Sequence, residues 1–268
     1  GSDNLKRLIR DAAADKNIKA LVLRIDSGGG SAFASEVIRN ELNLLQAAGK
    51  PLVVSMGSVA ASGGYWIAAA ADEIWATSST LTGSIGIFGA FPTFDRSLEK
   101  LGVGTDGIGT TDLAGSLRVD RPVNPIAAAA LQQNLEYGYS QFLSIVASGR
   151  DMLPEQVDKI AQGRVWSGKD AQEIGLVDKL GSLEAAIESA AQLAELTDYG
   201  VETLKEPLPP GAELLRLFMD QVGFITPQIK MPSALDSLLQ PYAQTIKSLE
   251  QMNDPRGIYL QCTACSSL

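Results

Sequence analysis

The chain has 268 residues, 45% of them hydrophobic, which is enough for one large domain with an appendage or for two small domains. Its 22 basic and 31 acidic residues give a net charge of −9, so we expect no nucleic-acid partner. It contains no histidine, so a serine hydrolase with this sequence would need lysine, a carboxylate or a group from another chain as its base.

The first 60 residues or so predict a helix followed by a parallel β-α-β unit. The expected elements are a helix over 4–14, a strand over 19–26, a flexible glycine loop over 27–31, a helix over 32–48 and a strand over 51–57. In such a unit the loop and the end of the second strand both lie at the carboxyl ends of strands. We therefore expect them to share one edge of the sheet.

The uncharged stretch 51–71 continues from that second strand and is the most informative part of the chain. It places Ser62 directly before Gly63-Gly64 and an alanine-rich run, a pattern that predicts a strand, a tight turn and the start of a helix. A serine there can present its hydroxyl to a cleft, next to the unpaired N–H groups of the helix. The alternatives are a membrane span, which the serines, glycines and Pro51 disfavour, and a closely packed strand and helix without chemistry, which Ser-Gly-Gly alone would favour.

The glycine loop 27–31 has neither the lysine of a phosphate-binding loop nor the spacing of a dinucleotide fingerprint. Its alternative use is to leave backbone N–H groups unobstructed so that they can stabilise an oxyanion. That use fits a nucleophilic serine at the same sheet edge.

The remaining elements are predicted from the spacing of apolar residues, from helix-capping residues, and from the glycine and proline residues that end helices and strands. They are strands over 73–77 and 84–88, a helix capped by Thr93 that ends at Gly102, a strand over 104–109, an irregular loop over 110–123, a helix from Asn124-Pro125 to about Ser148, a helix from Leu153-Pro154, a strand and turn over 163–168, a helix capped by Ser167 that ends at Gly175, a strand over 176–179 and a helix capped by Ser182 that ends at Leu196.

We assign residues 1–206 to one compact domain and residues 207–268 to an extension. The extension holds two amphipathic stretches, 213–222 and 235–249, and a coil tail from Asn253. Cys262 and Cys265 are the only cysteines, and two incidental thiols are the favoured interpretation, with a local disulfide as the alternative. We expect no metal and no cofactor.

Four segments, in this order and spacing, resemble the signal peptide peptidase A (protease IV) family over roughly residues 4–200. They are Leu23–Ser31, Ser55–Trp66, Leu81–Gly86, and Gly163–Gly168 with Gly175–Asp178. The match is closest to the C-terminal half of the long, two-repeat form of Gram-negative bacteria. The resemblance implies an α/β, Clp-protease/crotonase-like fold with repeated β-β-α units and a C-terminal helical extension.

The resemblance also implies a serine–lysine dyad with Ser62 as nucleophile. Its oxyanion hole would use the N–H groups of Gly29 and Gly63, and Ser84 would help to orient the lysine. The substrate-binding residues implied are Gly28, Gly30 and Gly64.

Two departures from the family pattern matter. Gly28 replaces the usual proline of the loop, which leaves the loop less constrained. The place where short members carry the base holds Ala114, and no lysine lies between Lys100 and Lys159. In the long form the lysine comes from an N-terminal repeat, so we expect this chain to supply the nucleophile half and to have low activity alone.

The resemblance implies two kinds of partner: peptide substrates, namely released signal peptides, and the lysine-bearing repeat. We also expect the chain to self-associate, because a half-repeat without its partner leaves apolar surface uncovered and the amphipathic stretches offer more. The implied location is the bacterial inner membrane, with the catalytic domain facing the periplasm, anchored through a segment outside these residues. Two other functions stay open: a crotonase-like acyl-CoA hydratase or isomerase, and a non-catalytic assembly domain with a vestigial serine.

Overall fold

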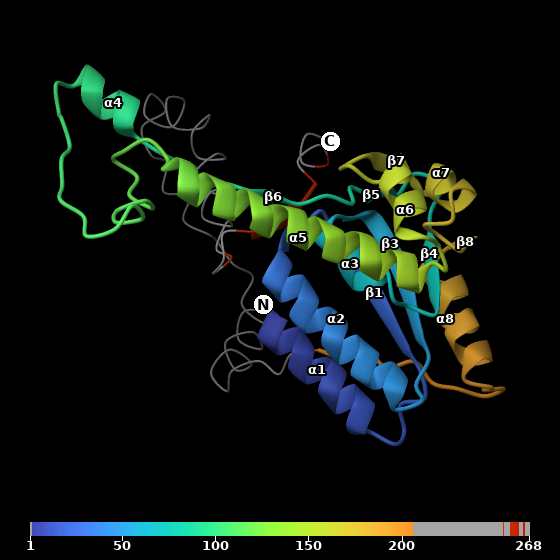
Figure 1. The fold of residues 1–268 in the computed structure, drawn as a ribbon. Helices are drawn as coiled ribbons and strands as arrows, with labels where there is room; N and C mark the ends of the chain where they lie inside the picture. Colours follow the sequence, from blue (N-terminus) through green and yellow to red (C-terminus); the bar gives the residue numbers. More distant parts are fainter. Residues whose placement is uncertain (1, 206–253, 255–257, 263–264, 266–268) are drawn as a thin grey trace, which may run out of the picture.

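The computed structural model describes residues 2–205, 254, 258–262 and 265. A six-stranded mixed sheet forms the centre of the fold (Figure 1). The strand order is β7-β5-β3-β4-β8, with β1 also paired to β3, and the β5–β7 pair is antiparallel while the other pairs are parallel. The strands are β1 (Leu21–Ser27), β3 (Leu52–Ala61), β4 (Glu73–Ala76), β5 (Leu81–Gly83), β7 (Val165–Ser167) and β8 (Lys179–Leu180).

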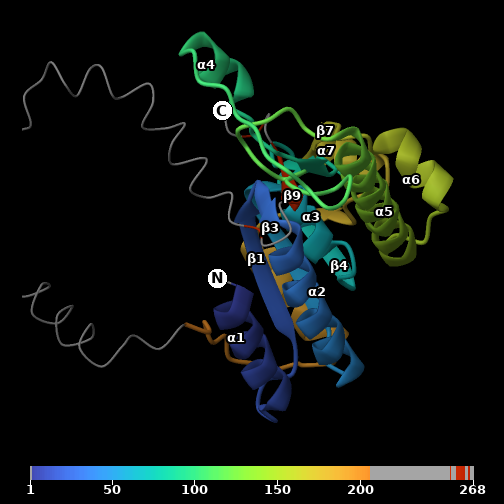
Figure 2. The same cartoon turned by 60° about the vertical axis from the view of Figure 1, so that its left-hand side comes forward.

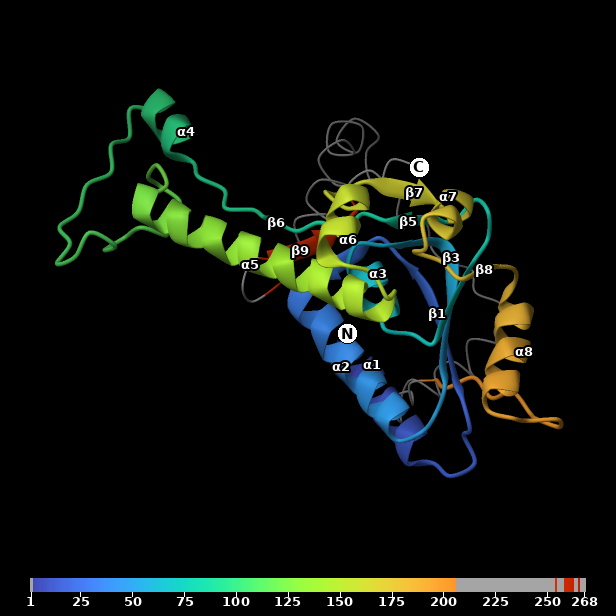
Figure 3. The same cartoon turned by 45° about the vertical axis from the view of Figure 1, so that its right-hand side comes forward.

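Helices cover both faces of this sheet, as parallel strands require. Figures 1 and 3 show α1 and α2 on one face and α8 on the other. Along β3 the side chains alternate accordingly, because Leu52 and Val54 join the main core whereas Val53 packs with Ala186 and Ala190 of α8. The helices are α1 (Ser2–Ala14), α2 (Ala32–Ala47), α3 (Gly63–Ala68), α4 (Asp95–Lys100), α5 (Pro125–Gly149), α6 (Pro154–Ile160), α7 (Gly168–Glu173) and α8 (Leu183–Leu193).

Strand β3 changes partners halfway along. Its first half pairs with β1 and β4, and its last three residues pair with β5, while Ala60 still pairs with Ser27 of β1. The register against β1 slips between these halves, where the Asp26 carboxylate accepts a hydrogen bond from the Val59 N–H at 3.0 Å. The slip directs the end of β3, and the turn that follows it, toward β5.

A second, three-stranded sheet lies beside the ends of β1 and β3. Its order is β2-β9-β6, and both pairs are antiparallel. The strands are β2 (Gly29–Ser31), β6 (Phe88–Gly89) and β9 (Ile258–Gln261). Strand β9 therefore comes from the far end of the chain and lies between two segments of the main domain, next to α3 (Figures 2 and 3).

The α/β class is confirmed, and so are the β-α-β unit and the caps of three helices. The side chains of Asn124, Ser167 and Ser182 accept hydrogen bonds from the first turns of α5, α7 and α8. The irregular loop over 110–123 is also confirmed. The amphipathic stretches 213–222 and 235–249, and with them the expected helical extension, lie outside the described residues.

Several element predictions were wrong. A strand over 84–88 does not form, because Ser84 adopts a positive φ of 49° and ends β5. Residues 104–109 form no strand; they lie in an exposed arm and pair with no neighbouring strand. The flexible loop 27–31 contains β2, the coil predicted from Asn253 contains β9, and Phe94 rather than Thr93 precedes α4.

Residues 90–123, which include α4, form an arm that projects from the body in Figure 1. Many of its apolar side chains are exposed: Phe94, Leu101, Val103, Ile108, Leu113, Leu117 and Val119. Among the described residues no helix has both the length and the apolar character that crossing a membrane requires.

Candidate active site

Ser62 occupies the turn between β3 and α3. Its backbone has φ 52° and ψ −113°, a conformation that is costly for a residue with a side chain. The residue is only 1% exposed, and its N–H donates to the Gly83 carbonyl of β5 at 2.8 Å. No hydrogen bond ties its side chain to the first turn of α3, so the hydroxyl does not act as a helix cap. A strained serine that does not cap its helix is typical of a nucleophile held by its surroundings.

The backbones of Gly29 and Gly63, the predicted oxyanion pair, come together beside this turn. A β-carbon built on Gly29 would lie 2.7 Å from the Gly63 nitrogen, and one built on Gly63 would lie 3.2 Å from the Gly29 α-carbon. Both positions therefore need glycine, and Gly29 also has a φ of 101°. The Gly29 N–H itself donates to the Ser27 hydroxyl at 3.1 Å, so it would have to exchange this partner to bind an oxyanion.

Ser84, the predicted supporting residue, lies at the end of the neighbouring strand. Because Ala61 pairs with Gly83, Ser62 and Ser84 are the residues that directly follow two adjacent parallel strands. Ser84 is buried, and it lines a cavity of about 300 Å³ together with Gly86, Ile87, Phe88, Tyr139, Gln162 and Gly163. The structure thus brings Ser84 into the neighbourhood of the predicted nucleophile.

Tyr139 is the titratable side chain on the wall of this cavity. Burial and its 2.6 Å hydrogen bond to the Asp158 carboxylate raise the pKa of Tyr139 to about 12. Tyr139 is therefore protonated at neutral pH and donates a hydrogen bond, which makes it unsuited to act as a general base.

Helix α3 is held firmly behind Ser62. The Trp66 indole N–H donates to the Glu36 carboxylate of α2 at 2.8 Å, and the buried Tyr65 hydroxyl donates to the Leu176 carbonyl at 2.8 Å. Although burial opposes it, the hydrogen bonds from Arg39 and Trp66 lower the pKa of Glu36 below its ordinary value. These contacts fix the turn from two sides without using its hydroxyl.

The predicted substrate-binding glycines lie in two places. Gly30 pairs with Leu260 of β9, and the Gly28 carbonyl accepts a hydrogen bond from the Cys262 N–H at 2.7 Å. Gly64 instead packs against β1, where a β-carbon would lie 2.8 Å from the Ser27 carbonyl oxygen. Gly28 and Gly30 thus lie along β9, whereas Gly64 faces the large sheet.

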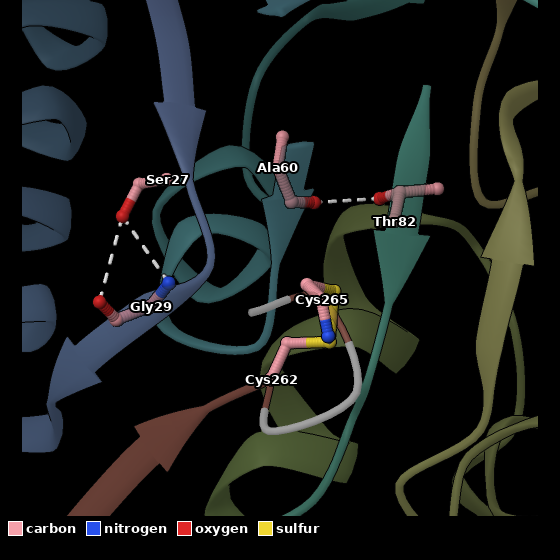
Figure 4. The surroundings of a disulfide bond; sticks show 6 residues. All are labelled: Ser27, Gly29, Ala60, Thr82, Cys262 and Cys265. Carbon is pink, nitrogen blue, oxygen red and sulfur yellow. Dashed lines mark hydrogen bonds between the residues drawn. A yellow bond between two sulfur atoms is a disulfide. The ribbon is translucent and has the colours of Figure 1, made fainter. Parts of the chain in front are cut away.

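Cys262 and Cys265 form a disulfide, so interpreting them as incidental thiols was wrong and the alternative is confirmed. Figure 4 shows this disulfide between the Ser27–Gly29 turn and the hydrogen-bonded pair Ala60 and Thr82. Sequence reasoning missed the place of the tail altogether. The signal present in the sequence was the short apolar run at 258–260, just before the first cysteine.

A base for Ser62 is not found among the hydrogen bonds of the described residues. Lys100 lies on α4 in the projecting arm, and Lys169 lies at the start of α7, where its backbone N–H donates to the Ser78 carbonyl. Neither lysine side chain is hydrogen-bonded to Ser62 or Ser84 within the described part of the chain. Ala114, at the place of the family lysine, is exposed on the same arm.

Comparison with known proteins shows which family shares the part of the chain that contains this site. The model of the family described as peptidase family S49 matches residues 45–197, a span that includes Ser62, Gly63 and Ser84. Protease 4 of Haemophilus influenzae is 42% identical over 275 residues, covering all of this chain and 44% of the relative. The chloroplastic serine protease SPPA of Arabidopsis thaliana is 39% identical over 214 residues, covering 80% of this chain and 32% of the relative.

The chain thus spans less than half the length of these relatives. Among solved structures, a ClpP1 mutant from Listeria monocytogenes aligns with 69% of this chain and 86% of its own, with a TM-score of 0.47 and 13% identity.

Proposed function

The chain belongs to peptidase family S49, and from that premise we propose that it is the nucleophile-bearing part of a serine endopeptidase of the serine–lysine dyad type. Ser62 attacks the carbonyl carbon of the scissile peptide bond, and its proton passes to a neutral lysine amine. The developing oxyanion is stabilised by the N–H groups of Gly63 and Gly29. The lysine then returns the proton to the leaving amine as the C–N bond breaks, which leaves an acyl ester on Ser62. A water molecule deprotonated by the same lysine hydrolyses that ester and restores the serine hydroxyl.

The observation that carries this proposal is the Ser62 turn. Its backbone is strained, its hydroxyl is not used as a cap, and the Gly29 and Gly63 backbones converge beside it. A serine that served packing alone would have no need of this conformation, which glycine adopts at no steric cost.

We further propose that the base is a lysine from a segment outside these 268 residues. The absence of histidine from the sequence supports this, as do the exposed Ala114 and the greater length of the relatives. Such a lysine would need a pKa lowered by burial toward the working pH, and contact with this chain would bury it.

The substrates in this proposal are signal peptides after their release, bound in extended form, and the location is the periplasmic face of the bacterial inner membrane. Short strands such as β2 and β6 support extended binding, because a peptide can add to the edge of a strand by backbone hydrogen bonds. The disulfide supports an oxidising compartment such as the periplasm.

Labelling with a fluorophosphonate tests the proposal at its centre. We expect the reagent to modify Ser62 when the lysine-bearing N-terminal repeat is joined or co-expressed, with intact-mass analysis locating the adduct, and we expect Ser62→Ala to abolish the modification. Ser144→Ala, at an exposed serine on α5, serves as the matched control and should still be labelled. Turnover of an acyl-CoA thioester with no labelling would instead support the crotonase-like function, and neither reaction would support an assembly domain.

A further inference from the structure

The turn that follows α6 adopts a strained backbone and is joined to Ser84. Gln162 and Gly163 have φ values of 57° and 75°, a conformation that costs free energy at Gln162 because it carries a side chain. Beyond the β5–β7 pairing, the Ser84 N–H donates to the Arg164 carbonyl at 2.6 Å. The Gly163 N–H donates to the Ile85 carbonyl at 3.0 Å. The position of Ser84 therefore depends on the conformation of this turn.

A tyrosine and a carboxylate hold the same turn from its other side. The Tyr139 hydroxyl of α5 accepts a hydrogen bond from the Gln162 N–H at 3.2 Å and donates one to the Asp158 carboxylate of α6 at 2.6 Å. Asp158 also accepts a longer bond, at 3.4 Å, from the side-chain amide of Gln162. Helices α5 and α6 lie side by side in Figures 1 and 3, so the pair links both helices to the strained turn.

Close packing fixes the segment that begins at Ser84. A β-carbon built on Gly86 would lie 3.1 Å from the Gly163 nitrogen, which leaves no room for a side chain between the segment and the turn. On the side of α5, a β-carbon built on Gly138 would lie 2.6 Å from the end of the Ile87 side chain. The segment is thus confined by the turn on one side and by α5, the helix that carries Tyr139, on the other.

We propose that Tyr139 and Asp158 are positioning residues for catalysis: they hold the turn at 162–163, and the turn holds Ser84 where it orients the base. This inference rests on the proposed function and deepens it by adding two side chains that lie outside the segments on which the family resemblance depends. Neither side chain is among those proposed to contact the peptide. Loss of the Tyr139 hydroxyl should therefore slow the chemical step without weakening substrate binding.

The test is peptide hydrolysis by the chain co-expressed with the lysine-bearing N-terminal repeat. Rates are divided by the concentration of Ser62 that a fluorophosphonate labels at completion, so a loss of folded protein does not count as a loss of activity. Tyr139→Phe removes only the hydroxyl, and the variant should fold because the exposed Gln162 can bind water instead. We expect kcat to fall at least tenfold and KM to stay within twofold of the parent. Tyr137→Phe, a matched change at a tyrosine of the same helix that is 66% exposed, should behave like the parent.

Asp158 supplies a second set of variants, which decides the matter should Tyr139→Phe fail to fold. Asp158→Asn keeps an oxygen that can accept from Tyr139 and should retain at least half of the parent kcat, whereas Asp158→Ala should be as slow as Tyr139→Phe. Because both side chains act through one turn, the double variant Tyr139→Phe with Asp158→Ala should be no slower than either single variant. The proposal is wrong if kcat per labelled site stays at the parent value in Tyr139→Phe or Asp158→Ala, or if Asp158→Asn is as slow as Asp158→Ala.

Amide hydrogen exchange in the 268-residue chain alone, followed by NMR, separates this inference from the proposed function. We expect Tyr139→Phe to speed exchange at the N–H groups of Ser84 and Gly163 at least tenfold, and Tyr137→Phe to leave it unchanged. Unchanged exchange in Tyr139→Phe would overturn the positioning role. Hydrolysis that persists in Ser62→Ala, or that is absent from the parent with its repeat, would instead overturn the proposed function, and the hold of Tyr139 on Ser84 would still be judged by exchange.

Discussion

At the scale of single residues, the feature that matters most is the strained backbone of Ser62. Strain at φ 52° and ψ −113° is relieved by glycine but not by alanine, since only glycine lacks the β-carbon that causes it. The native fold therefore carries a cost at this turn, and in the proposed function that cost serves to aim the hydroxyl.

We predict that Ser62→Gly raises the free energy of unfolding relative to Ser62→Ala by about 1 kcal/mol, a strain of 1–3 kcal/mol offset in part by the entropy of glycine in the unfolded chain. Both variants lose fluorophosphonate labelling. Urea denaturation followed by circular dichroism checks the order of stability. Equal stability of the two variants would show that the turn stores no strain.

Gly29 is the residue where the proposed oxyanion hole and β9 meet. Alanine there needs a β-carbon 1.9 Å from the Leu260 carbonyl oxygen, at a φ of 101°. Gly30→Ala is a matched control, since its φ of 152° also disfavours a side chain but its β-carbon would have no atom within 4 Å. We predict that Gly29→Ala lowers the free energy of unfolding by at least about 1 kcal/mol more than Gly30→Ala, the range in which overpacking costs fall. A melting-temperature comparison that found the two equal would contradict the close contact with β9.

At the scale of elements, Glu73 joins three parts of the large sheet layer. Its carboxylate on β4 accepts hydrogen bonds from Lys179 of β8 and Ser189 of α8, as well as from the Trp75 indole. Although burial opposes it, these bonds lower the pKa of Glu73 below its ordinary value of 4.5. The charged form therefore stabilises the fold.

We predict that this stabilisation is complete above pH 4.5, the unfolded value, and is lost as the pH falls through the lower pKa of the folded state. Glu73→Gln should lower the free energy of unfolding by about 1 kcal/mol at pH 7, a small value for a hydrogen bond to a charged group because Glu73 is partly exposed. It should also make the free energy of unfolding fall less steeply as the pH is lowered. Unfolding free energies at pH 7 and pH 3.5 check this, with the exposed Glu188→Gln as control. If the free energy of unfolding of the variant fell as steeply with decreasing pH as that of the parent, the role given to Glu73 would be contradicted.

The regular elements of the main domain could be predicted because their signals are local. The apolar run of β3 and the caps at Asn124, Ser167 and Ser182 all follow from neighbouring residues. The same holds for the placement of the glycine loop and Ser62 at one sheet edge, since parallel strands end there together. The position of Ser84 came from the resemblance alone.

What could not be predicted depends on partners distant in sequence. Strands β2 and β6 are too short to show a period, and they exist because β9 pairs with both. The position of β9 depends in turn on Asp254, whose carboxylate contacts Ser31 more than 200 residues away. The disulfide could be named as an alternative, but its place beside the Ser27–Gly29 turn could not be predicted.

At the scale of the whole molecule, the arm 90–123 is the surface best suited to contact another protein. It exposes Leu101, Ile108 and Leu117, and isolated domains seldom leave so many apolar side chains on one projection. The predicted self-association thus has a candidate surface within the described residues, in addition to the stretches after 207.

We predict that the chain self-associates and that Ile108→Asp combined with Leu117→Asp weakens the association at least tenfold. Light scattering over a range of concentrations measures it, and Leu44→Asp, an exposed apolar position away from the arm, is the control. A strict monomer at high concentration would count against self-association, and an unchanged oligomer in the double variant would exclude the arm as its surface.

The central claim is that Ser62 is a nucleophile whose base lies outside these 268 residues. Serine enzymes stripped of their triad keep some ~10³-fold acceleration from their remaining groups, so the chain alone should retain only residual catalysis. The direct measurement is the rate of peptide hydrolysis by the chain alone and by the chain with a lysine-bearing N-terminal repeat, joined or co-expressed. We predict a gain of several orders of magnitude that disappears when that repeat's lysine is changed to alanine. Hydrolysis by the chain alone at the full rate, with Ser62 still required, would contradict the account and assign the base to one of its own lysines, such as Lys100 or Lys169.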